Sequence, residues 1–165
     1  MRSYSLAYLT AANLTPPQML AAAAQLGYGH VGLRLRPNAP GAPYQPLLGD
    51  AAILRETLAV QHDTGVGVFD IEIVRIDAAF DLKAYLPMFE AAAALRARAV
   101  LVAGDDTDLA RLADNYARLC AVLQPYGMTA DLEFMPWTAV PHAQAALRTV
   151  QAAGHPSNAG ILVDA

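Results

Sequence analysis

The fold is decided by the stretch Phe69-Asp70-Ile71-Glu72-Ile73, in which acidic side chains alternate with apolar ones. The same pattern returns in the stretch Asp131-Leu132-Glu133-Phe134. Alternation with a period of two is typical of a strand with two different faces. A flat sheet covered by helices on both faces would bury these carboxylates without partners, at a cost of several kcal/mol each. A parallel barrel, whose interior opens to water at one end, accommodates them.

Short β-rich runs recur along the whole chain, and each is followed by a segment rich in alanine and leucine with helical spacing. This alternation predicts an α/β fold with a parallel sheet. The runs start 26 to 36 residues apart, close to the size of one βα unit of about 30 residues. The chain thus supplies about five βα units and a sixth strand. The predicted strands are Tyr4–Leu9, His30–Arg36, Val66–Ile76, Ala99–Ala103, Met128–Phe134 and Gly160–Asp164.

Helix-end signals agree with this division. Thr15 followed by Pro16 predicts a helix start, and Gly27 predicts its end in the left-handed conformation. Further N-caps are expected at Asp50, Asp81 and Thr107, and further C-terminal glycines at Gly65, Gly127 and Gly154. Pro87 predicts a late start or a kink in the third helix. Residues at three- and four-residue spacing give the fourth helix an apolar face: Leu109, Leu112, Tyr116, Leu119 and Val122.

Composition excludes several classes of protein. The 165 residues suffice for one domain, and 55% hydrophobic against 16% charged residues excludes intrinsic disorder. The net charge of −4 argues against nucleic acid or an anionic membrane as the main partner. Cys120 is the single cysteine, so no internal disulfide is possible, which suits a reducing cytoplasm. No segment has the pattern of a spanning helix or a secretory signal.

Several segments of the chain follow one known family pattern. They are Ser5-Leu6-Ala7-Tyr8-Leu9-Thr10, Leu14-Thr15-Pro16-Pro17, the run 27–35, the stretch 69–73, Leu132-Glu133-Phe134-Met135-Pro136-Trp137 and the run 160–165. Together they resemble the xylose isomerase-like TIM barrels, the sugar phosphate isomerase/epimerase superfamily. The resemblance covers the whole chain and about the N-terminal two-thirds of such a barrel. It implies that residues 1–165 form a single partial (β/α)8-barrel domain.

The resemblance also implies a metal site. Members of this superfamily bind one divalent metal through a Glu at strand five, an Asp at strand six, a His at strand seven and a Glu at strand eight. Glu133 matches the first ligand and Asp164 the second, and the chain ends at Ala165 before the other two. Carboxylates suit Mg²⁺ or Mn²⁺, and less selectively Co²⁺ or Zn²⁺. Glu133 would also be the catalytic base, and the alternative for both acids is a structural salt bridge.

Three further side chains are candidates for substrate binding. Arg34 could bind a phosphate or carboxylate, but it could equally be the partner of Glu72, which in turn could bind a sugar hydroxyl or pair with Arg34 or Arg75. Trp137 could stack on a sugar ring or pack at the rim. His142, in the loop after the fifth predicted strand, is a weaker candidate for the mouth of the barrel.

The resemblance implies a metal-dependent isomerase or epimerase of a small sugar, sugar phosphate or keto-polyol that works through an enediolate. The alternatives are a dehydratase of a keto-polyol on the same scaffold, and a catalytically silent fragment or binding module. A complete barrel needs about 250 residues, so the chain is expected to be part of a longer protein or to be completed by a second copy. By itself it is expected to be inactive, to bind metal weakly, and to form homo-oligomers through open strand edges.

Overall fold

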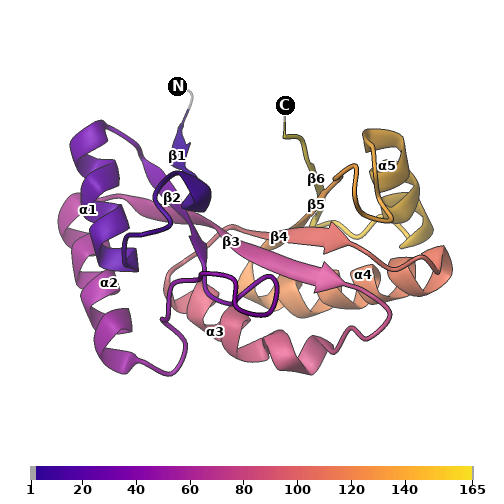
Figure 1. The fold of residues 1–165 in the computed structure, drawn as a ribbon, viewed down its shortest axis with the longest axis horizontal. Coiled ribbons are helices and arrows are strands. Elements are labelled where there is room, and N and C mark those ends of the chain that lie inside the picture. The colour runs from indigo at the N-terminus through magenta and orange to yellow at the C-terminus, as the bar shows by residue number, and fades with distance from the viewer. Residues whose placement is uncertain (1–2, 165) are drawn as a thin grey trace. The chain divides into compact units, whose positions relative to one another are not determined.

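The computed structural model describes residues 3–164 and shows strands and helices in regular alternation (Figure 1). The helices are α1 (Pro16–Leu26), α2 (Ala51–Thr64), α3 (Leu86–Ala94), α4 (Leu109–Leu123) and α5 (Ala143–Ala152). The strands are β1 (Ser5–Leu6), β2 (His30–Arg34), β3 (Gly67–Ile76), β4 (Ala99–Gly104), β5 (Thr129–Glu133) and β6 (Ala159–Leu162). Short 3-10 helices are η1 (Tyr8–Thr10), η2 (Leu82–Tyr85) and η3 (Gln124–Tyr126).

The strand order is β1-β2-β3-β4-β5-β6, so each strand follows its sequence neighbour in the sheet. The pairs β1–β2, β2–β3, β4–β5 and β5–β6 are parallel. This confirms the predicted parallel α/β order. The contacts divide the chain into two compact units, Met1–Glu72 with Pro87–Arg98 and Ile73–Leu86 with Ala99–Ala165, and β3 contributes residues to both. The prediction of a single domain stays a prediction.

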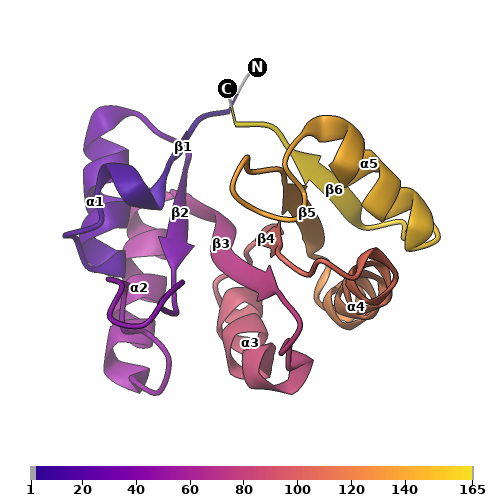
Figure 2. The same cartoon turned by 45° about the vertical axis from the view of Figure 1, so that its right-hand side comes forward.

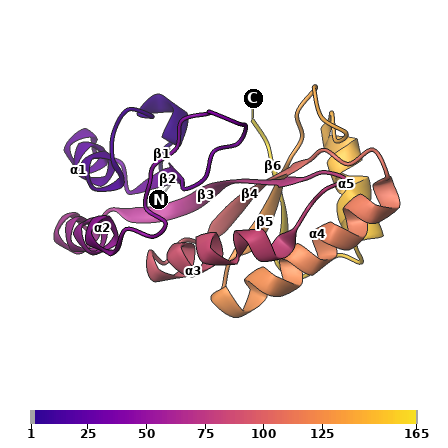
Figure 3. The same cartoon turned by 60° about the horizontal axis from the view of Figure 1, so that its bottom comes forward.

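In the first unit, α1 and α2 run side by side (Figure 3). Thr15 and Gln18 form a capping box at the start of α1, and Gly27 ends it at φ 79°, as predicted. Met19 and Leu20 of α1 and Val31 of β2 are all fully buried. The apolar face of α1 therefore packs on the strands of this unit.

In the second unit, α4 and α5 flank the strands β5 and β6 (Figure 2). Leu112, Tyr116 and Leu119 of α4 are fully buried, as the spacing predicts. The Tyr116 hydroxyl donates to the carbonyl of Ala130 at 2.7 Å, and its contact with the Gly160 carbonyl is 3.3 Å. This side chain therefore ties α4 to two neighbouring strands.

Some local predictions were wrong. Thr107 is not the N-cap of α4, because the carboxylate of Asp108 accepts the amides of the first turn instead. Leu109 is 60% exposed and lies off the apolar face. The first strand is only two residues long, because the chain turns into η1 at Tyr8. The sixth ends at Leu162, so Asp164 lies beyond it. The late start predicted at Pro87 is confirmed, since α3 begins at Leu86.

Candidate functional site

Glu133 is placed by the register of the second unit. It is the last residue of β5 and pairs with Ala103 on one side and Leu162 on the other. Residues paired in this way point to the same side of a sheet. Ala103 and Leu162 belong to an apolar cluster with Ile73 and Leu101. We call the strand face that carries Ala103, Glu133 and Leu162 the inner face, and Glu133 lies on it half-buried.

Asp131 lies one layer below Glu133 on the inner face, because it precedes Glu133 by two residues in the strand. It pairs with Leu101 and Gly160. The absence of a side chain at Gly160 makes room for the Asp131 carboxyl group, which a Cβ at position 160 would strike. Burial raises the pKa of Asp131, and a hydrogen bond from the Thr129 side chain opposes this. The inner face therefore carries carboxyl groups in two successive layers.

Asp164, the second predicted metal ligand, is exposed and lies two residues past the end of β6. The alternation that puts Leu162 on the inner face would put Asp164 on the same side if the chain stayed extended. Within residues 3–164, no group of three or more His, Cys, Asp or Glu side chains is arranged to hold a metal ion. The metal-ligand roles of Glu133 and Asp164 therefore stay predictions.

The first unit brings Arg34 and Glu72 together. They pair in register on β2 and β3, and Arg34 Nη2 lies 2.9 Å from Glu72 Oε1. Their side chains are only 9% and 12% exposed. Burial raises the pKa of Glu72, and the neighbouring Arg34 guanidinium counteracts part of that effect. The alternative in which these two residues are partners is thus what the structure shows, and a role in substrate binding remains a proposal.

Two residues around Arg34 escaped the sequence analysis. Gln45 forms two hydrogen bonds with the Arg34 backbone. The side-chain oxygen of Gln45 accepts from the Arg34 backbone amide at 3.3 Å, and the backbone amide of Gln45 donates to the Arg34 carbonyl at 2.7 Å. Tyr8 lies under the guanidinium, whose carbon is 4.5 Å from the ring centroid. Tyr8 lies two residues after the end of β1, and this position near a strand end was the available signal. No local pattern singles out Gln45 in its proline-rich loop.

A second ion pair stands at the end of β4. Arg75 Nη1 donates to Asp105 Oδ2 at 2.7 Å, with both side chains about one-third exposed. From the sequence, Arg75 was expected only as a partner for Glu72. Within the second unit the structure instead gives it Asp105, which comes directly after β4.

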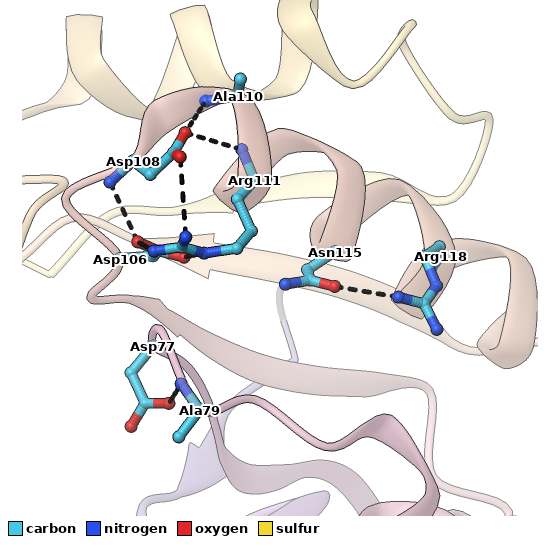
Figure 4. Close-up of polar contacts among 8 residues, drawn as sticks. All are labelled: Asp77, Ala79, Asp106, Asp108, Ala110, Arg111, Asn115 and Arg118. Carbon is cyan, nitrogen blue, oxygen red and sulfur yellow. Dashed lines mark hydrogen bonds and ion pairs between the residues drawn. The ribbon is translucent and has the colours of Figure 1, made fainter.

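Asp106 has a structural role that Figure 4 shows. Its buried carboxylate accepts two hydrogen bonds from Arg111, at 2.6 and 2.7 Å, and one from the Asp108 amide at 2.9 Å. The hydrogen bonds from Arg111 hold the pKa of Asp106 below its usual range, against the opposing effect of desolvation. In the same view, Asp77 accepts from the amide of Ala79. Asp106 therefore holds the start of α4 and is not a free acid.

The remaining candidates are on the loop after β5. Trp137 is 77% exposed, so it is not a packing residue, and its ring is accessible for stacking. His142 is the N-cap of α5, where Nδ1 accepts from the Ala145 amide at 3.2 Å. That cap accounts for His142 without a role in a site.

No family model and no curated protein matches the chain. Among solved structures, a xylose isomerase domain protein from Salmonella typhimurium LT2 matches at TM-score 0.76 and 16% identity, over 94% of this chain and 60% of that one. The IolI protein, solved with a bound zinc atom, matches at TM-score 0.72 and 18% identity, over 99% and 63%. The D-allulose 3-epimerase of a Methylomonas species, in complex with D-allulose, matches at TM-score 0.70 and 14% identity, over 96% and 61%.

The chain spans about 60% of the length of these proteins. At such low sequence identity the likeness concerns the fold. It confirms the resemblance inferred from the strand segments and the fold class that followed from it. The chain therefore has the fold of the xylose isomerase-like TIM barrel proteins, over the part of that barrel which it spans.

Proposed function

We propose that this chain belongs to a metal-dependent isomerase or epimerase of a small sugar, sugar phosphate or keto-polyol. The observation that carries the proposal is the position of Glu133, a half-buried carboxylate at the end of a parallel strand, on a face shared with an apolar cluster. Catalytic groups in barrels of this kind come from the ends of strands. The fold likeness to a D-allulose 3-epimerase supports the same class of reaction.

The donor chemistry fits a divalent metal in kind. Glu133 and Asp164 offer hard oxygen ligands, which suit Mg²⁺, Mn²⁺, Co²⁺ or Zn²⁺. A structural neighbour, the IolI protein, was solved with zinc. When bound, such a metal would polarise the carbonyl group of the substrate. Two carboxylates are fewer ligands than a tight site needs, so we propose that residues outside this chain complete it.

The reaction we propose is a proton transfer next to a carbonyl group. Glu133 accepts the proton from the carbon α to the carbonyl, and the substrate becomes an enediolate. Return of a proton to the neighbouring carbon, with transfer of the hydroxyl proton to the former carbonyl oxygen, completes an isomerisation. Return to the opposite side of the same carbon completes an epimerisation. We propose that Arg34, Glu72 and Trp137 orient the substrate.

The test is a Glu133→Gln substitution in the whole protein that carries this chain. Turnover of a panel of ketoses with Mn²⁺, together with exchange of the substrate proton for solvent deuterium, should fall by about 10²–10⁴-fold, as expected for loss of a general base. Glu90→Gln, on the exposed side of α3, is the matched control and should leave both rates unchanged. Release of an unsaturated product would indicate a dehydratase instead. Absence of exchange in the wild-type protein would indicate a silent module.

Location is a separate part of the proposal. No helix within residues 3–164 is both long and apolar enough to cross a membrane. The single cysteine, Cys120, is a buried free thiol, and burial raises its pKa to about 11, so it is kept in its unreactive form. We propose that the protein works in the cytoplasm.

A further inference from the structure

A groove lies between the start of α4 and one side of α5, and all of its lining residues belong to the second unit. Its volume is about 330 Å³, within the range of small-molecule pockets, about 300–1,000 Å³. None of its lining residues has a role in the proposed reaction. We call it the α5 groove, and its apolar lining consists of Leu109, Ala139, Pro141, Ala145 and Ala152.

The wall of the groove that belongs to the loop after β5 is fixed by hydrogen bonds. The Met135 amide donates to the Val140 carbonyl at 2.9 Å, and the Thr138 hydroxyl donates to the Met135 carbonyl at 2.9 Å. Val140 is fully buried, and its side chain fills the space beside Gly104. The residues on either side of Val140, which line the groove, are therefore held in place before any ligand binds.

The polar groups on the α5 side of the groove already have partners. The Thr149 hydroxyl donates to the Ala145 carbonyl at 3.1 Å, and His142 Nδ1 accepts from the Ala145 amide at 3.2 Å. A molecule rich in hydroxyl groups, such as a sugar, would lose hydrogen bonds to water on entering and gain few in return. The interior of the groove therefore suits an apolar body.

The charge at the groove is positive and available. Arg148 lines it, is exposed, and forms no ion pair within residues 3–164, unlike Arg34 and Arg75. Among the described residues, no Asp or Glu side chain lines the groove. A guanidinium group binds a carboxylate through two parallel hydrogen bonds. The molecule that complements the groove thus combines an apolar body with a carboxylate.

We propose that the α5 groove binds a small monocarboxylic acid with an apolar body, whose carboxylate pairs with Arg148. The apolar body covers Leu109, a large hydrophobic side chain that is 60% exposed at the start of α4. The site is separate from the proposed reaction, since Glu133 lies on the inner face and does not line the groove. The groove thus takes a molecule of a different class from the proposed substrate.

The test is calorimetry on the 165-residue chain with 4-phenylbutanoate and with 4-phenylbutan-1-ol, which has the same apolar body and no charge. The acid should bind about three- to tenfold more tightly than the alcohol, because its contact with Arg148 is charge-assisted. Arg148→Gln should remove this preference. Arg118→Gln removes an equal charge from the exposed side of α4, outside the groove, and as the matched control should keep the preference.

A second pair of variants locates the binding site. Ala152 is exposed and lines the groove, so Ala152→Phe should fill one end of it without disturbing the core and should abolish binding of both compounds. Gln151→Phe adds the same side chain at the neighbouring exposed position, outside the groove, and should leave binding unchanged. Thermal unfolding followed by circular dichroism should show that both variants fold like the wild-type chain.

The outcomes that overturn the proposal are distinct from those that bear on the proposed function. Equal affinity for acid and alcohol, or an unchanged preference in Arg148→Gln, would overturn it. Binding of neither compound would overturn it as well, and a dimer in light scattering that Ala152→Phe dissociates would then show a second copy in the groove. Glu133→Gln should bind the acid like the wild-type chain, because the groove does not depend on the proposed reaction.

Discussion

Gly160→Ala tests the register that places Glu133 on the inner face. In the structure, a Cβ at position 160 would overlap Asp131 Oδ1 and come within 3.0 Å of Asp131 Cγ and 3.6 Å of its Cα. The distance to the Cα is an ordinary van der Waals contact, so the overlap falls on the Asp131 carboxyl group, which would be forced out of its place beside β6. The substitution should therefore destabilise the protein, although alanine is normally the better residue in a strand.

The expected magnitude follows from two opposing effects. Overpacking of a filled site costs about 1–3 kcal/mol, and replacing glycine with alanine returns about 0.4–1 kcal/mol by restricting the unfolded chain. The net loss in the free energy of unfolding should be about 1–2 kcal/mol. For a chain of this size, that corresponds to a fall in melting temperature of roughly 2–8 °C.

The assay is urea and thermal unfolding followed by circular dichroism, with Asp131→Ala as the matched background. Without the Asp131 carboxyl group the added methyl has room, so Gly160→Ala should there stabilise the protein by about 0.5 kcal/mol. This reversal of sign is the critical result. If Gly160→Ala has the same effect in both backgrounds, Asp131 does not face Gly160, and the layer argument for Glu133 fails with it.

Further predictions concern caps, packing, titration and assembly. Asp108→Ala should lower the free energy of unfolding by about 1 kcal/mol through loss of the N-cap of α4. Thr107→Ala should leave the free energy of unfolding unchanged in the same thermal unfolding experiment. Tyr116→Phe should cost about 1 kcal/mol, because its buried hydroxyl donates to the Ala130 carbonyl at 2.7 Å. An unchanged melting temperature would refute that anchoring role. Burial raises the pKa of Glu72 above its ordinary value of 4.5, so the native state holds this proton more tightly than the unfolded chain. The free energy of unfolding should then fall as pH rises from about 4.5 through the folded pKa. In the Glu72→Gln variant, the free energy of unfolding measured by urea titration at each pH should lack this decrease. Finally, β6 pairs only with β5 within residues 3–164, and such an edge favours self-association, so light scattering should show oligomers, and a clean monomer would contradict this.

Local rules of chemistry account for the parts of the fold that could be predicted. Gly27, Gly65 and Gly127 end helices in the left-handed conformation, which side chains disfavour in any tertiary context. Asp50 caps α2 for a reason equally local, because its carboxylate accepts the amides two and three residues ahead. Such signals need no knowledge of distant residues.

The start of α4 shows where local rules stop being sufficient. From the sequence, the N-cap was expected at Thr107, but the neighbouring Asp106 and Asp108 are also residue types that cap helices. The choice depends on Arg111, which draws the Asp106 carboxylate into a bidentate contact and leaves Asp108 to cap the helix. A side-chain partner outside the motif therefore decides the outcome.

In the candidate site, too, some features follow from the local sequence pattern and others from the tertiary structure. Alternation alone placed Glu72 and Glu133 on polar strand faces, since a period of two is a property of any strand. Alternation separates Glu72 from Arg75, which lies three residues further along the same strand, but it does not choose a partner for Glu72 on the neighbouring strand. The register of β2 against β3 selects Arg34. The neighbouring Asp70 shows the same dependence, as its carboxylate fills the space next to Gly32 on the adjacent strand.

The sequence by itself determined the alternation of strands and helices, the parallel order and the polar faces of the strands, because periodicity and capping act over a few residues. Only the tertiary structure decided which charges are partners, that Tyr8 supports the buried arginine, and that Gln45 holds it in place. Those contacts join residues 11 to 38 positions apart in the chain. Their existence depends on strand register and loop path, which no short stretch of sequence encodes.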